Sequence, residues 1–169
     1  MSQTRNEAEA LARALEFGLL DVPDVIAWAD AQILREDRPS EALCDLSLAR
    51  GPYPVDGAGM LRRFPGTPNS PVAARLLLSL MKERLKHEVA CADRIAGMLY
   101  RMALADEIED PSLREISRWA WDELDLAEFG DIEESREEIV RQMVDALAAA
   151  TADNDSKWSF TVLGERPNG

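Results

Sequence analysis

The chain has 169 residues, with 32 acidic side chains, 19 basic side chains, one histidine and a formal net charge of −13. Proteins that bind nucleic acid gain most of their affinity by neutralising phosphates, and a chain with this negative charge should repel them. We therefore expect no nucleic-acid partner. No stretch approaches the ~20 apolar residues of a membrane span, and the first residues lack a signal peptide. We therefore expect a cytoplasmic protein with no membrane partner.

The first third of the chain predicts three helices. The first spans about residues 4–17 and ends at a glycine. The second begins at Asp21, a good capping residue, and is followed by the proline and aspartate that suit a first turn. Its expected buried face consists of Val22, Val25, Ile26, Ala29 and Ile33. The third helix begins after Ser40 and ends at Gly51.

The remaining helices follow a segment rich in glycine and proline. Residues 53–69 predict an irregular connection that contains one short helical turn at 60–64. Ser70 is the predicted cap of a central helix whose apolar side chains cover most of its circumference. Three more helices are predicted over about residues 89–105, 112–130 and 133–150. Ser112 is the expected cap of the second of these, and Glu115 completes a capping box.

Helical periodicity and short connections predict an all-α fold. We expect residues 1–150 to form a single compact domain of six to eight helices, orthogonal or bundle-like. Residues 151–169 predict an extended C-terminal tail, because Trp158 and Phe160 alternate with polar residues. We expect residues 157–163 to dock these two rings on the domain or on a second copy, so the protein is a monomer or a homodimer.

Charge is unevenly distributed along the chain. Residues 62–101 hold eight basic and three acidic side chains, whereas residues 106–138 hold fourteen acidic side chains and three arginines. Two interpretations stay open. The acidic C-terminal helices can pack across the basic middle helix, or they can form a surface that attracts a basic protein partner.

The acidic segment also carries aromatic residues that the helical pattern leaves partly exposed. Aromatic side chains within a charged rim are typical of tight protein interfaces. The predicted partner-binding residues are Trp121, Asp122, Asp125, Glu128 and Phe129. In charge and helical class the chain is similar to immunity-type proteins that neutralise basic toxins, without a matching motif. The favoured hypothesis is a non-catalytic interaction protein of bacterial type, either an immunity-type inhibitor or a regulatory binder.

The alternative hypothesis is a small helical enzyme or ligand-binding domain with a buried polar pocket. Asp30 and Glu123 fall among the apolar residues of their predicted helices. A buried carboxylate needs a cation or a hydrogen-bond donor, and the basic middle helix offers Arg84 and His87. The predicted pocket therefore consists of Asp30, Arg84, His87 and Glu123.

Motifs for catalysis or metal binding are missing from the sequence. A single histidine cannot form the paired Glu-x-x-His motifs of a di-iron bundle, and no zinc spacing, Gly-x-Ser-x-Gly or P-loop is present. The two cysteines, Cys44 and Cys91, lie in apolar helical segments and are expected to act as small hydrophobic residues. We therefore predict no catalytic residue, no metal and no cofactor.

Overall fold

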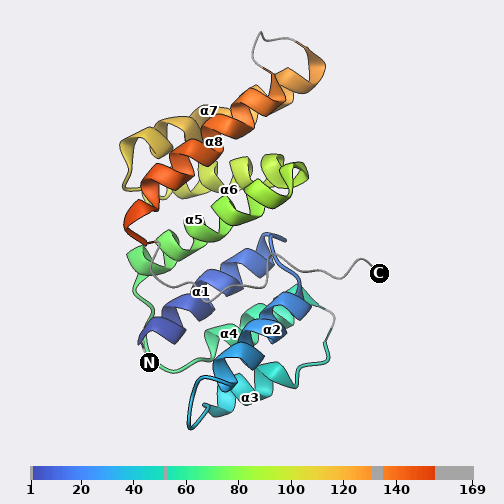
Figure 1. Cartoon of the computed structure of the whole chain (residues 1–169), viewed down its shortest axis with the longest axis vertical. Helices are drawn as coiled ribbons and strands as arrows, with labels where there is room; N and C mark the ends of the chain where they lie inside the picture. Colours follow the sequence, from blue (N-terminus) through green and yellow to red (C-terminus); the bar gives the residue numbers. More distant parts are fainter. Residues whose placement is uncertain (1, 52, 131–134, 155–169) are drawn as a thin grey trace. The chain divides into compact units, whose positions relative to one another are not determined.

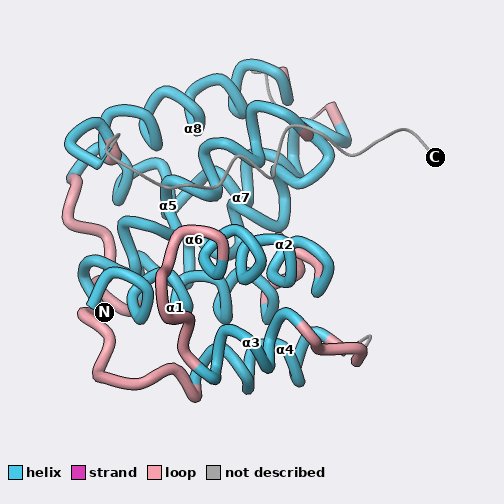
Figure 2. Tube along the Cα trace, turned by 60° about the horizontal axis from the view of Figure 1, so that its bottom comes forward, coloured by secondary structure: helices cyan, strands magenta, loops and turns pink. Residues whose placement is uncertain are grey.

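The structure is a computed structural model that describes residues 2–51, 53–130 and 135–154. These residues form eight α-helices and two short 3-10 helices and contain no strand (Figure 1 and Figure 2), which confirms the all-α prediction. They fall into two compact units, divided between Leu77 and Leu78. A single domain over residues 1–150 stays a prediction. So does the docking of residues 157–163, which lie outside the described residues.

The first unit contains α1 (Ser2–Glu16), α2 (Val22–Ile33), α3 (Glu41–Ser47) and α4 (Pro54–Arg62). In this unit α1 packs against α4, and α2 packs against α3 (Figure 1). Every one of these helices contributes to the core, whose buried side chains include Leu11, Leu15, Trp28, Leu46 and Leu61. The next helix, α5 (Ser70–His87), begins in the first unit and ends in the second.

Helix α4 replaces most of the predicted irregular connection, so the prediction of only a short turn at 60–64 is wrong. Pro54 occupies the first turn of α4, where a backbone N–H would have no intrahelical partner. Gly57 lies within the helix and is buried. A Cβ atom at this position would lie 3.1 Å from Cδ1 of Leu15, so glycine permits the close approach of α4 to α1. Proline and glycine often mark turns, but here the proline begins a helix and the glycine allows that helix to pack closely.

The second unit contains α6 (Ala92–Leu104), α7 (Pro111–Phe129) and α8 (Arg136–Ala150), with the 3-10 helices η1 (Val89–Cys91) and η2 (Ala152–Asn154). Helix α7 packs against both α6 and α8 (Figure 1). Helices α6 and α8 both contribute to the core of this unit, whose buried side chains include Ile95, Met98, Leu99, Met102, Ile139, Met143, Ala146 and Leu147. Arg136 pairs with Asp93 and joins α8 to α6. The hydrogen bonds that Arg136 donates lower the pKa of Asp93.

Two helices have caps that lie one or two residues upstream of the predicted ones. Asn69, rather than Ser70, caps α5, because its Oδ1 accepts a hydrogen bond from the backbone N–H of Val72 at 3.1 Å. Asp110, rather than Ser112, caps α7 by accepting from the N–H of the third helical residue at 2.8 Å. In both helices the predicted serine lies inside the first turn, next to a proline, and an upstream Asn or Asp side chain reaches the free N–H.

The turn between α6 and α7 is held by Arg114. Its Nε and Nη2 atoms donate to the backbone carbonyl of Ile108 at 2.9 and 2.6 Å. Its Nη2 also lies 3.3 Å from Oδ1 of Asp106, a residue with a left-handed φ of 57°. Because Ile108 is fully buried, the guanidinium provides donors to a carbonyl at a site with little access to water.

Replacing Arg114 with alanine is expected to lower the free energy of unfolding by about 1–3 kcal/mol, because the Ile108 carbonyl loses both donors. Arg118→Ala provides a matched control on the same helix, since Arg118 is exposed, and we expect a change within about 0.5 kcal/mol. Urea denaturation of both variants measures the difference. Equal losses in the two variants would show that Arg114 does not hold this turn.

Candidate functional site

The outer face of α7 carries exposed apolar and acidic side chains together. The large apolar side chains exposed here are Trp121 (50%), Leu126 (39%) and Phe129 (73%). The exposed carboxylates among them belong to Asp122, Asp125 and Glu128. Spacings of three and four residues bring side chains to one side of a helix, as for Asp122, Asp125 and Phe129. These six residues are called the α7 surface.

The indole of Trp121 is supported on one side. The ring of Tyr100, on α6, lies against it with a centroid separation of 6.0 Å and an interplanar angle of 41°. Half of the Trp121 side chain nevertheless stays exposed. A ring that is already held in place loses less conformational freedom on binding, so this geometry suits an interface anchor.

Two of the three carboxylates of the α7 surface form no ion pair with a described residue, whereas Glu128 interacts electrostatically with Arg136. Among the described residues, no basic side chain lies within ion-pair distance of Asp122 or Asp125. Two basic residues of α5 pair locally instead: Arg84 lies 2.8 Å from Glu88, and Lys86 lies 3.5 Å from a carboxylate one turn away. The negative charges of Asp122 and Asp125 are therefore available to an approaching molecule.

The prediction of a buried polar pocket is wrong for two of its four residues, Asp30 and His87. Asp30 is exposed and accepts a hydrogen bond from the hydroxyl of Ser47, on α3, rather than from an arginine or histidine. His87 is exposed at the end of α5. Arg84 and Glu123 are half-buried, and Arg84 forms an ion pair within its own segment.

The error arises because the face that α2 buries is rotated about the helix axis from the predicted face. The residues that α2 buries are Val22, Val25, Trp28, Ala29 and Gln32. Ile26 and Ile33, which were expected in the core, are only half-buried. The buried face extends to Trp28 and Gln32, and Asp30 lies away from it. In α7 the shift is smaller, and it moves Glu123 to the edge of the buried face.

Among the described residues, the one carboxylate that is truly buried belongs to Glu7 of α1, which is 3% exposed. Its Oε2 accepts hydrogen bonds from Trp28 Nε1 at 3.0 Å and Gln32 Nε2 at 3.3 Å, and its Oε1 accepts from Gln3 at 3.2 Å. Burial raises the pKa of Glu7, while the hydrogen bonds from Trp28 and Gln3 and the charge of Arg35 oppose this rise. The cluster joins α1 to α2.

The cluster around Glu7 was not predicted from the sequence, although a signal was present. Glu7 precedes Leu11 by four residues and Ala14 by seven, and this spacing places all three on one face of α1. Leu11 and Ala14 are fully buried. An acid in line with two core residues was the available indication of a buried carboxylate.

The groups that could support catalysis are dispersed. In the part of the chain that the structure describes, no three His, Cys, Asp or Glu side chains are grouped to hold a metal ion. Cys91 is buried as predicted, and burial raises the pKa of its thiol, which disfavours a reactive thiolate. Cys44 is exposed, contrary to expectation, because the short helix α3 buries Leu43 and Leu46 instead.

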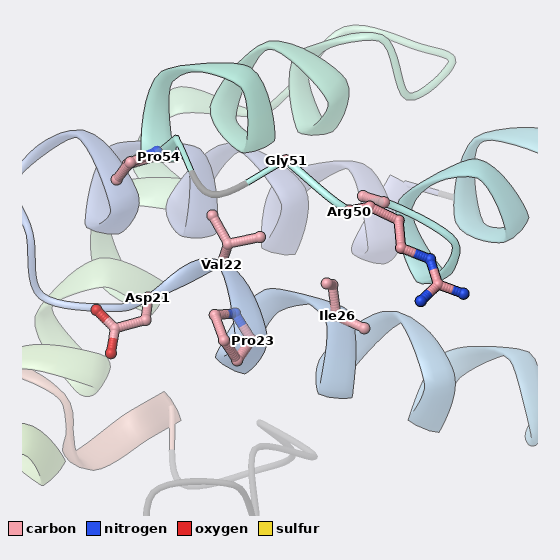
Figure 3. Close-up of a pocket in the computed structure, with 8 residues that line it drawn as sticks. Asp21, Val22, Pro23, Ile26, Arg50, Gly51 and Pro54 are labelled. Atoms are coloured by element: carbon pink, nitrogen blue, oxygen red, sulfur yellow. The ribbon is translucent and has the colours of Figure 1, made fainter.

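A cavity of about 490 Å³ lies between the start of α2 and the segment that joins α3 to α4. Figure 3 shows Val22 and Ile26 between the carboxylate of Asp21 at one end and the guanidinium of Arg50 at the other. Pro54, from the first turn of α4, also lines it. The cavity is thus an apolar groove with charged ends, and Arg50 is exposed at its rim.

A second cavity, of about 370 Å³, lies where the first turns of α1 approach the connections that follow α2 and α4. Its lining residues include Arg5, Glu36, Arg38, Ser40, Phe64 and Pro65. Phe64 is 4% exposed, and its ring centroid lies 5.8 Å from that of Trp28. This cavity therefore adjoins the core of the first unit.

Comparison of the chain with protein-family models, curated proteins and solved structures finds no match. Of the helices that the structure describes, none has both the length and the apolar character that crossing a membrane requires.

Proposed function

We propose that this protein is a non-catalytic binding protein that uses the α7 surface to recognise a basic protein partner, as an immunity-type inhibitor or a regulatory binder. The observation that carries the proposal is the exposure of Trp121 and Phe129 beside two carboxylates, Asp122 and Asp125, that form no ion pair with a described residue. Large apolar side chains are costly to leave in water, and grouped ones mark interaction sites.

The two kinds of side chain on this surface have different roles in the proposal. Burying the exposed parts of Trp121 and Phe129 supplies affinity, at up to about 1.5–3 kcal/mol for each fully buried ring. The carboxylates attract a positively charged partner, orient it and disfavour acidic competitors. Association is therefore fast at low salt and slows as ionic strength rises.

The cytoplasm is the proposed location, and the protein acts as a monomer or a homodimer. Both cysteines, Cys44 and Cys91, are free thiols, and thiols persist in the reducing cytoplasm. The exposed position of Cys44 on α3 supports this proposal, because exposed thiols are readily oxidised outside reducing compartments.

Reversing three charges of the α7 surface tests the proposal. With the partner recovered from the native host as ligand, Asp122→Lys, Asp125→Lys and Glu128→Lys together are expected to weaken binding about tenfold or more at low salt. The fold should be retained, because all three side chains are exposed. Binding kinetics at several salt concentrations should show a slower association rate and a weaker salt dependence than for the native chain.

A matched triple variant distinguishes the effect of the α7 surface on binding from the effect of net charge. Asp37→Lys, Asp45→Lys and Glu109→Lys change the net charge equally at exposed positions outside the α7 surface. We expect this variant to bind as the native chain does. If both triple variants lose the partner to the same extent, net charge alone explains the binding, and the α7 surface is not the interface.

A further inference from the structure

The side chain of Arg5 is buried and incompletely hydrogen-bonded. Its Nε donates to the backbone carbonyl of Gly66 at 3.3 Å, and its Nη2 pairs with Oε2 of Glu9 at 3.3 Å. Its Nη1 is buried without a hydrogen-bond partner, and the whole residue is only 7% exposed. Buried donors nearly always have an acceptor, so the guanidinium of Arg5 keeps unused hydrogen-bonding capacity beside the cavity that this residue lines.

The surroundings of Arg5 are held in place by contacts to a single connection, residues 63–69. Besides the bond from Arg5 to Gly66, Oδ1 of Asn6 accepts from the backbone N–H of Asn69 at 2.7 Å. Phe64, in the same connection, packs its ring against Trp28. Three contacts along seven residues therefore fix the wall of the 370 Å³ cavity that Arg5 lines.

The other residues of this cavity add a second positive charge and an apolar wall. Arg38 is exposed and forms no ion pair with another described residue. Phe64 and Pro65 present apolar surface, while Glu36 lies in the same lining. A negatively charged ligand is attracted by the two arginines and repelled by Glu36, and the apolar wall adds a preference for a ligand with an apolar part.

From this geometry we infer that the cavity binds a small organic carboxylate with an apolar body. The carboxylate accepts hydrogen bonds from Arg5 and Arg38, since guanidinium groups match carboxylate geometry. The apolar body lies against Phe64 and Pro65. This site belongs to the first unit and is separate from the α7 surface, so each can be tested without the other.

Titration of the ¹⁵N-labelled full chain with phenylacetate tests the inference. We expect saturable shifts of the Trp28 indole N–H and the Gly66 amide, with a Kd of about 1 mM for a ligand of this size. Phenylacetamide, which has the same shape without the charge, is expected to bind at least about tenfold more weakly. Inorganic phosphate, which lacks the apolar body, should also bind more weakly.

Two arginine variants assign the site. Arg38→Gln is expected to weaken phenylacetate binding about fivefold or more with little change in the melting temperature, because Arg38 is exposed. Arg50→Gln is the matched control, since Arg50 is an exposed arginine that lines the other cavity. Its affinity should match that of the native chain. The inference is overturned by absence of saturable shifts, by equal binding of phenylacetamide, or by equal effects of the two variants.

Discussion

Replacing Glu7 with alanine is expected to lower the free energy of unfolding by about 2–5 kcal/mol, because two buried donors lose their acceptor. These donors are the indole N–H of Trp28 and the side-chain amide of Gln32, and both bind Oε2 of Glu7. Asp30→Ala is the control, since Asp30 is exposed and its loss should change stability by about 0.5 kcal/mol or less. Urea denaturation of the two variants checks the contrast, and similar losses would contradict it.

Glutamine at position 7 separates the hydrogen bonds from the charge. Its side-chain oxygen can still accept from Trp28 and Gln32, and no ionised group is then buried. Because burial raises the folded-state pKa of Glu7 above 4.5, the folded chain binds more protons than the unfolded chain between the two pKa values. The contribution of Glu7 to stability therefore falls as pH rises through this window and is constant above it. We expect Glu7→Gln to remove this pH dependence and to be at least as stable as the native chain at neutral pH.

Most of the helices could be predicted from the sequence because their determinants are local. Ser40 caps α3 by accepting a hydrogen bond from the backbone N–H three residues ahead, as its sequence position suggested. Gly130 ends α7 in a left-handed conformation, which glycine adopts without strain. Such signals involve residues within one turn of each other, so the rest of the fold does not alter them.

The faces of the helices were harder to predict, because they depend on partners distant in the sequence. Helix α2 has apolar residues around much of its circumference, so the pattern fits a core that includes Ile26 and Ile33 as well as one that includes Trp28. Hydrogen bonds to Glu7, 21 residues from Trp28 and 25 from Gln32, accompany the second arrangement. A shift of this kind moves Asp30 from the predicted core to the surface.

The two candidate sites differ in how far the sequence indicated them. The α7 surface lies within one helix, so Trp121, Asp125 and Phe129 could be grouped by their spacing alone. The cavity at Arg5 is lined from three separate segments, including residues 36–40 and 64–65. Nothing in the spacing of these residues indicates that they meet.

Replacing Gly57 with valine is expected to lower the free energy of unfolding by about 1–3 kcal/mol, because α4 lies too close to its neighbours for a branched side chain. A Cβ atom at Gly57 would lie 3.1 Å from Cδ1 of Leu15 and 3.6 Å from Cγ2 of Val22. Leu15 and Val22 are themselves buried, so neither can move aside without disturbing the core of the first unit. Thermal denaturation of the variant measures the loss.

Gly59, on the same helix, provides the matched control for this effect. A Cβ atom there would meet nothing within 4 Å, and the residue is exposed. Gly59→Ala is therefore expected to raise the free energy of unfolding by about 0.5–1 kcal/mol, because alanine loses less backbone entropy in a helix. The two substitutions should thus have opposite signs. A stable Gly57→Val variant would mean that α4 is not held against α1 as closely as the structure shows, and glycine would then have no packing role in this helix.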